Sequence, residues 1–331
     1  MIRGLFFLAL HFICLHLMQA RAQHADLPQI LELQQPDTSL VSFPYAMALA
    51  TDTLPASSTP SYRKPLFYAG LATATGLAYT GLWTLWYAGY PQQDFHFFDD
   101  SRQWGGMDKL GHFTTAYTIG YLGHASFTWA GAKPTTARWI GGALGLGFLT
   151  GIEIMDGFSS QWGFSWLDMG ANTLGAALFI GQDLAWKEQR ITPKYSYFPS
   201  EFAAKRPELL GRNWTEQWLK DYNGQRYWLS FNVASFLPQE LKSGFPKWLN
   251  LAVGYSIRGY LGASENPTAF SHIPRTQHWY LSLDVDLRKI PTKSPFLRTL
   301  FTAIGFVKIP APAFEWNNAT GGNFNFHPLF F

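Results

Sequence analysis

The sequence predicts an α+β protein, with a bundle of about four apolar, Gly- and Ala-rich helices in residues 63–190 and about five antiparallel strands in residues 191–331. The first region contains long uncharged runs, and the second alternates apolar with polar residues, which is the period of a strand. Only 14% of the residues are charged, whereas soluble domains carry about 25%. This indicates a membrane-associated protein or a large buried fraction. A net charge of +3 without a basic stripe argues against nucleic acid as a partner.

The N-terminus predicts export. Arg3 precedes a short apolar run, and "ARA" at 20–22 forms the A-x-A pattern that signal peptidase recognises. We therefore assign residues 1–22 to a signal peptide and expect the mature chain to begin at Gln23. Residues 23–62 are rich in Pro, Ser and Thr and show no sustained period, so they are predicted to form a flexible tether.

An alternative for the N-terminus is a lipid anchor. Cys14 is the only cysteine of the chain, and acylation there would make the protein a lipoprotein. Ile13 is bulky where the residue before an acylated cysteine should be small, so the sequence favours cleavage after Ala22 and leaves the anchoring mode open. Without Cys14 the mature chain has no thiol, which suits an oxidising compartment.

Four apolar runs are the helix candidates. The first, 65–90, carries no charge over 26 positions, and about 20 apolar residues suffice to cross a membrane, so we predict a transmembrane helix there. The second, 110–132, is also long. The third and fourth, 139–152 and 169–182, are short, and whether they span is left open. Small residues recur at four-residue spacing, which favours close helix packing, as in Gly141–Gly145, Gly147–Gly151 and Ala171–Gly175.

The basic residues argue against four plain inner-membrane spans. If all four runs spanned, the side opposite Arg102 and Lys109 would carry seven basic residues, which reverses the positive-inside rule. The seven are Arg63, Lys64, Lys133, Arg138, Lys187, Arg190 and Lys194. We therefore expect an exported envelope protein that is only partly inserted or reaches another membrane, with the outer membrane or a periplasmic face favoured.

The period of the apolar residues changes to two after about residue 195, as expected for antiparallel strands with one dry and one wet face. We predict that residues 226–331 form such a sheet, with strands that include 304–309 and 323–331. The predicted buried face consists of Leu249, Leu251, Val253, Leu281, Leu283 and Val285. Because an open sheet edge cannot face hydrocarbon, these strands should pack on the helices, on the membrane surface or on an envelope partner.

Seven polar residues lie at the ends of the apolar helices. Glu153 and Asp156 are three residues apart, and Asp168 and Asn172 are four apart, so each pair lies on one face of its helix. Ionisable side chains in apolar helices are costly and normally pair inside a bundle. We therefore expect Asp108, His112, Glu153, Asp168 and Asn172 to lie in one polar pocket, and Lys109 and Asp156 join them as candidate site residues.

The order of these motifs resembles a known family. "DKLGHF" at 108–113 is followed by a Glu-x-x-Asp element at 153–156 and a Ser-x-x-Asp-x-x-x-Asn-x-x-Gly element at 165–175. This set looks like the YfiM-like family of predicted periplasmic or envelope lipoproteins, and it is more distantly similar to the VanZ-like membrane family. The resemblance covers roughly residues 95–185. It implies an envelope location and brings no established reaction.

Two main classes of function fit the cluster, with transport as a third. In a non-catalytic envelope protein, which the sequence slightly favours, the cluster is a hydrogen-bonded lock and the β region docks membrane lipid or a protein partner. In an envelope enzyme acting on a lipid or a lipid-linked phosphate, His112 is the acid or base, Asp108 fixes its tautomer and Lys109 meets an anion. Glu153 and Asp168 are then bases or metal ligands, and the identity of any cofactor is left open.

Overall fold

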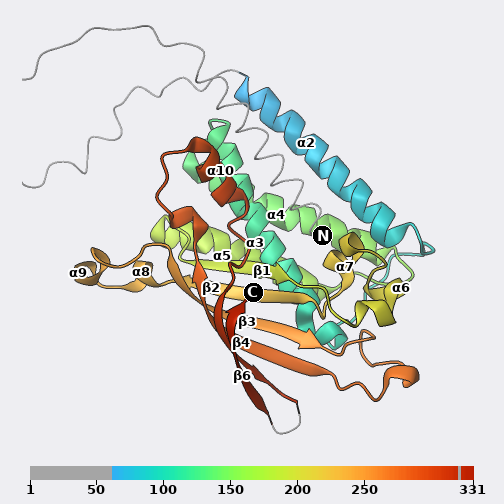
Figure 1. Cartoon of the computed structure of the whole chain (residues 1–331). Coiled ribbons are helices and arrows are strands. Elements are labelled where there is room, and N and C mark those ends of the chain that lie inside the picture. Colours follow the sequence, from blue (N-terminus) through green and yellow to red (C-terminus); the bar gives the residue numbers. More distant parts are fainter. Residues whose placement is uncertain (1–61, 320–321) are drawn as a thin grey trace, which may run out of the picture.

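The computed structural model describes residues 62–319 and 322–331 (Figure 1). The signal peptide predicted at 1–22, with Cys14, and the mature start at Gln23 lie outside the described residues. Most of the predicted tether lies outside them as well. Within the described ranges the long helices come first along the chain and lie together above the sheet in Figure 1. The predicted α+β class is therefore confirmed.

Four long helices form the bundle, and local sequence explains where they begin. Pro134 occupies the first position of its helix, where its missing N–H is not needed. Ser165 caps the last of the four by accepting a hydrogen bond from the Asp168 N–H at 3.2 Å. Two helices extend beyond the predicted runs 139–152 and 169–182, because the acidic residues at the ends of these runs are helical too. The bounds are α2 Arg63–Leu82, α3 Met107–Trp129, α4 Pro134–Gly157 and α5 Trp166–Trp186.

Glycines let α4 and α5 approach α3 closely. A Cβ at Gly145 would lie 2.3 Å from the Ala116 carbonyl oxygen, and one at Gly175 would lie 2.2 Å from the Phe113 carbonyl oxygen. By contrast, a Cβ at Gly147 would have no described atom within 4 Å. The predicted small-residue packing is therefore confirmed at Gly145 and Gly175 and is wrong at Gly147, which faces outward.

This contrast predicts opposite effects of one substitution. Gly145→Ala places a methyl group against the backbone of α3, and we expect it to lower the free energy of unfolding by about 1–3 kcal/mol through overpacking. Gly147→Ala gains helix propensity without a clash and should raise that free energy by about 0.5–1 kcal/mol. Thermal denaturation of the two variants measures the difference, and equal stability would contradict the close packing.

The prediction of a transmembrane helix is wrong for the described residues, because none of their helices combines the length and the apolar character needed to cross a membrane. The uncharged run at 65–90 does not form one continuous α-helix. α2 ends at Leu82 and passes into a single π-helical turn, Trp83–Tyr87. Thr, Tyr and Gly residues also interrupt the run and lower its hydropathy, although none of them carries a charge.

Six strands form one antiparallel sheet in the order β1-β2-β3-β4-β5-β6, where we predicted about five. They are β1 Ile191–Tyr197, β2 Gln225–Asn232, β3 Leu249–Arg258, β4 Thr276–Val285, β5 Ala311–Asn317 and β6 Asn323–Phe330. The strand predicted at 304–309 is wrong: a turn occupies its first half, and Val307 forms only an isolated bridge to Tyr195.

Short helices connect the strands and raise the number of α-helices in the described ranges to nine, where we predicted about four. They are α6 Pro207–Leu210, α7 Trp214–Lys220, α8 Val233–Phe236, α9 Gln239–Lys242 and α10 Pro295–Ala303. α6 to α9 are too short to show a helical period, so the pattern of apolar residues does not reveal them.

The sheet buries its polar face and leaves its apolar face exposed away from the helical bundle. The register pairs Leu251 with Leu283 and Val253 with Leu281, as predicted for residues of one face. These four side chains are nevertheless 42–46% exposed. The prediction that these residues are buried is therefore wrong, although the prediction that they share one face of the sheet is right.

Charged residues on the opposite face explain this inversion. Lys194 on β1 and Asp284 on β4 are buried, and Lys194 Nζ lies 2.7 Å from Asp284 Oδ2. In a flat sheet, strands three positions apart would be separated by about 14 Å, so the sheet must curve strongly to bring these side chains together. Lys308 Nζ lies on the same side, 3.8 Å from Asp284 Oδ1. The curvature encloses the polar face, where ion pairs offset part of the cost of desolvating the charges.

The bundle meets the sheet over one end of strands β1 to β3. Met107, the first residue of α3, packs with Tyr195, Tyr227 and Ile257 of the sheet and with Leu219 of α7. The predicted site residues of α3 follow Met107 directly, so this contact fixes the position of the first turn of α3 relative to the sheet.

Candidate functional site

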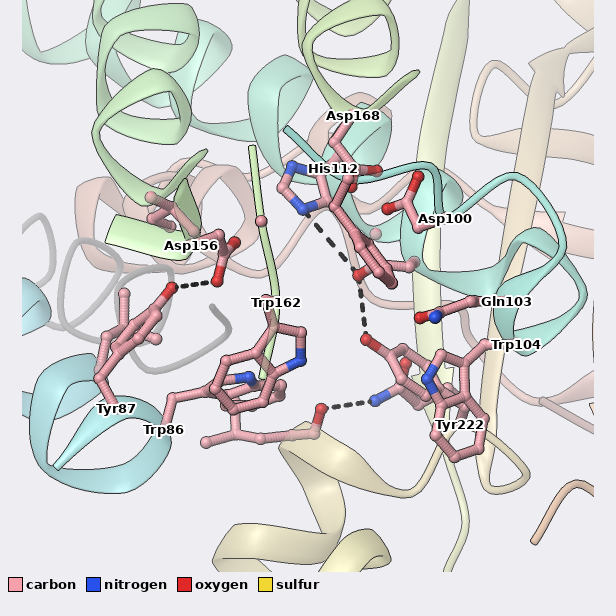
Figure 2. A pocket seen from close by; sticks show the side chains of 18 of the residues that line it. Trp86, Tyr87, Asp100, Gln103, Trp104, His112, Asp156, Trp162, Asp168 and Tyr222 are labelled. Atoms are coloured by element: carbon pink, nitrogen blue, oxygen red, sulfur yellow. Dashed lines mark hydrogen bonds and ion pairs between the residues drawn. The ribbon is translucent and has the colours of Figure 1, made fainter. Parts of the chain in front are cut away.

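A cavity of about 90 Å³ lies where the bundle meets the sheet (Figure 2). Acidic residues and His112 line the cavity together with several aromatic side chains, among them Trp86, Trp104 and Trp162. Figure 2 shows His112, Asp168 and Asp100 together, with Trp86 and Trp162 facing them across the cavity. The cavity therefore combines polar and aromatic walls.

His112 of α3 is buried, and its ring is held by Asn172 of α5. His112 Nδ1 lies 3.0 Å from Asn172 Oδ1, and because an amide oxygen can only accept, Nδ1 carries the proton and Nε2 presents a lone pair. Nε2 lies 3.5 Å from Glu153 Oε1 and 3.9 Å from Asp108 Oδ1. Burial lowers the pKa of His112, which keeps the ring neutral. Asn172 thus has the orienting role that we expected of Asp108.

Lys109 is enclosed by carboxylates. Its Nζ donates a hydrogen bond to Asp100 and lies 3.0 Å from Asp168 Oδ1 and 3.6 Å from Asp108 Oδ2. Although burial alone would lower the pKa of Lys109, these neighbouring negative charges raise it above its ordinary value. The ammonium group is therefore neutralised within the protein and is not free to meet an anion, which was its expected role.

Burial raises the pKa of three carboxyl groups of the cluster, with neighbouring negative charges adding to the effect. The pKa rises to about 9 for Glu153, where Asp156 contributes, and to about 10 for Asp168, where Asp108 contributes. It rises to about 8 for Asp156, which accepts a hydrogen bond from Tyr87 Oη at 2.8 Å. The ionised forms of these carboxyl groups are therefore costly at this place, and a further positive charge beside them would be favourable.

Two carboxyl oxygens of the cluster lack a hydrogen-bond partner. Glu153 Oε2 accepts a hydrogen bond from the Ser165 N–H at 3.0 Å, but Glu153 Oε1 and Asp168 Oδ1 are buried without one. Asp168 Oδ1 is in ion-pair contact with Lys109 Nζ at 3.0 Å. Buried polar atoms are normally satisfied, so these two oxygens need an explanation.

The predicted convergence of the cluster is confirmed. Residues from α3, α4 and α5 meet at the cavity or directly behind it, although 64 positions separate the first from the last (172 − 108). They are Asp108, Lys109, His112, Glu153, Asp156, Asp168 and Asn172.

Three further residues complete the cluster without having been predicted. Asp100 accepts hydrogen bonds from Lys109 and from Ser165 Oγ, Tyr87 binds Asp156, and Tyr222 Oη donates to Asp108 Oδ1 at 2.9 Å. Asp100 lies in the loop before α3, where "FFDD" provides a weak signal. Tyr222 lies 114 residues beyond Asp108, and no local pattern points to it.

Residues 94–180 match the family described as "Predicted periplasmic lipoprotein (DUF2279)". The chain is similar to this family over a segment that contains α3, α4 and most of α5, and with them every predicted site residue. The match supports an envelope protein of unknown function. The similarity to the YfiM-like and VanZ-like families that the motifs suggested is not confirmed, because the description of the matched family names neither of them. No curated protein and no solved structure matches the chain.

Proposed function

We propose that the protein is an envelope enzyme that hydrolyses an ester or phosphoester bond of a lipid or a lipid-linked phosphate. The observation that carries this proposal is the incomplete pairing of the polar cluster beside the cavity. Glu153 Oε1 and Asp168 Oδ1 lack hydrogen bonds, and each unsatisfied buried group costs about 1–3 kcal/mol. A structural lock would satisfy its polar atoms, whereas a site that awaits a ligand leaves some of them unpaired.

The form of the cavity favours an amphiphilic substrate. A volume of about 90 Å³ is small beside the roughly 300–1,000 Å³ of pockets that enclose a whole ligand, so the cavity accommodates only the reacting polar group of a larger substrate. Trp86, Trp104 and Trp162 line the cavity and offer apolar contacts to the part of the substrate that extends outward. A lipid, or a lipid-linked phosphate, has this division into a polar group and an apolar chain.

The polar residues in and behind the cavity have the chemistry that hydrolysis requires. Water adds to the phosphorus or acyl carbon, the bond to the alcohol breaks, the alcohol takes up one proton and the other passes to a basic group. Asp108, His112 and Asp168 contact the reacting group directly or through a bound ion. Glu153, 3.5 Å from His112 Nε2, is placed to take up a proton, and Asn172 positions the ring.

The exposed sheet face favours a second candidate, a non-catalytic protein that docks on membrane lipid. The register aligns Val253, Leu281, Phe314 and Phe326 in one apolar row across four strands. The neighbouring row on the same face, two residues further along the strands, contains Tyr255, Trp279, Trp316 and Phe324. An apolar surface edged by Trp and Tyr is the composition that suits a membrane interface. In this candidate the polar cluster has no chemical role.

One complementation experiment separates the two candidates. The gene is deleted in the source bacterium, and lipids and lipid-linked phosphates are quantified by mass spectrometry. If the protein is an enzyme, one lipid class should accumulate in the deletion strain and return to its normal level with the wild-type protein. His112→Ala and Asp168→Asn should fail to restore that level at normal protein abundance, while His124→Ala, on α3 but outside the cluster, should succeed.

The opposite pattern would favour docking. In that case both cluster variants restore the wild-type lipid profile, whereas Phe314→Ser, which places a hydroxyl on the apolar sheet face, releases the protein from the membrane fraction. Full complementation by His112→Ala and by Asp168→Asn would refute the enzymatic proposal.

A further inference from the structure

Negative charge outnumbers positive charge around the cavity. Lys109 forms ion pairs with three of the five carboxyl groups there. Within the described ranges, no lysine or arginine forms an ion pair with either of the other two, Glu153 and Asp156. The five carboxyl groups belong to Asp100, Asp108, Glu153, Asp156 and Asp168. The cluster is thus suited to a further cation, and it is poorly suited to bind an anion unaided.

The unpaired atoms of the cluster gather around His112. Glu153 is 1% and Asp168 3% exposed, and one carboxyl oxygen of each lacks a hydrogen bond. Glu153 Oε1 lies 3.5 Å from His112 Nε2, the nitrogen that presents its lone pair. Bulk solvent does not reach these atoms, because they are buried. A cation would compensate the charge and occupy the free lone pairs at once.

We propose that Asp108, His112 and Asp168 bind one divalent cation of the Zn²⁺ or Mn²⁺ type. One ligand atom of each lies within 4.8 Å of the other two, so after small adjustments a single ion can approach all three at about 2.0–2.3 Å. An imidazole nitrogen combined with carboxylate oxygens suits these ions, whereas Ca²⁺ and Mg²⁺ prefer oxygen ligands alone.

The groups behind the three ligands fit this assignment. A histidine that binds a metal commonly donates its other ring N–H to an oxygen, which fixes its orientation, and His112 Nδ1–H has Asn172 Oδ1 in that position at 3.0 Å. Asp168 would share its carboxylate between the ion and Lys109. Glu153 would stand beside the ion, with its second oxygen held by the Ser165 N–H.

The bound ion would also explain how a negatively charged cluster accepts a phosphate or carboxyl ester. It would supply the positive charge that Lys109, enclosed by carboxylates, does not offer. This part of the inference rests on the proposed function, whereas the cation site itself rests only on the geometry of the cluster.

Calorimetric titration of the full chain tests the site. The untagged protein is purified from the envelope in mild detergent, stripped with EDTA and titrated with ZnCl₂, MnCl₂, CaCl₂ or MgCl₂. We expect one ion per chain, with Zn²⁺ or Mn²⁺ bound at least tenfold more tightly than Ca²⁺ and Mg²⁺. His112→Ala and the nearly isosteric Asp168→Asn should each weaken this binding at least tenfold, whereas His124→Ala should leave it unchanged.

Circular dichroism and a cooperative thermal transition verify that each variant is folded, and Asp168→Asn keeps the test decisive if His112→Ala does not fold. Failure of the folded, stripped wild-type protein to bind stoichiometrically would overturn the inference, as would wild-type affinity in the folded cluster variants. Metal binding without any lipid change in the complementation experiment would refute the proposed function alone. A lipid change that depends on the cluster, in a protein that binds no metal, would refute the cation site alone.

Discussion

Asp284→Asn is expected to lower the free energy of unfolding by about 3–5 kcal/mol, the usual cost of removing one partner of a buried ion pair. Asp284 lies 2.7 Å from Lys194 Nζ and 3.8 Å from Lys308 Nζ, and the side chains of all three are fully buried. Asparagine keeps the shape of the side chain but removes its charge. Two ammonium groups then stay in the interior of the sheet with carbonyl oxygens as partners, which do not neutralise them.

The pH dependence of this loss would identify its cause. Burial lowers the pKa of Lys308 to about 8 and also lowers the pKa of Lys194, while Asp284 opposes both shifts. A lysine whose pKa is lower in the folded state destabilises the fold while it is protonated. That penalty is relieved as the pH rises through the folded pKa, because the folded chain releases its proton before the unfolded chain does. The deficit of Asp284→Asn should therefore be larger near about pH 6 than near about pH 9.

Chemical denaturation at the two pH values measures both effects, and Glu201→Gln is the matched control. Glu201 pairs with Arg258, but the two side chains are 60% and 62% exposed, and exposed pairs contribute about 1 kcal/mol or less. If Asp284→Asn were no more destabilising than Glu201→Gln, the buried ion pairs would not be what stabilises the curved sheet.

The sheet illustrates how far periodicity determines structure. Side chains alternate along a strand, so the pattern correctly places Leu251, Val253, Leu281 and Leu283 on one face. Which face becomes buried depends on curvature, and that depends on contacts across several strands, such as Lys194 with Asp284. Contacts between strands that are distant in the sequence leave no local sequence pattern. The assumption that the apolar side chains are buried therefore identifies the wrong face of the sheet as the buried one.

The sequence could predict those site residues whose burial carries an energetic cost, namely the charged residues in the apolar helices. It could not predict the other members of the site. Charged residues at the ends of apolar helices must find partners, which is why Asp108, Glu153 and Asp168 could be expected to converge. The identity of some partners could not be derived. Tyr222 comes from a loop after α7, and Asp100 comes from an irregular segment, so each reaches the cluster only through the way the bundle is seated on the sheet.

Lys109→Met and Asp168→Asn are expected to change stability by very different amounts. Lys109 is the ammonium group shared by Asp100, Asp108 and Asp168. Its removal leaves three carboxyl groups close together without a counterion, which should lower the free energy of unfolding by about 3–5 kcal/mol. Asp168→Asn removes one of five carboxyl groups that share a single ammonium group, and this relieves repulsion, so the stability of the variant should equal or exceed that of the wild-type protein, as at many functional sites.

Thermal denaturation of the two variants distinguishes a functional site from a structural lock. Lys205→Met is the control for Lys109→Met, because Lys205 is exposed and its loss should change the free energy of unfolding by less than about 0.5 kcal/mol. In a structural lock, every polar group is hydrogen-bonded or ion-paired with another member of the cluster, so Asp168→Asn would be as destabilising as Lys109→Met.

If the inferred cation binds to the cluster, adding Zn²⁺ or Mn²⁺ should restore part of the melting temperature that Lys109→Met loses, because the ion supplies the missing positive charge. The same addition should leave the melting temperature of His112→Ala unchanged, since that variant lacks the nitrogen ligand.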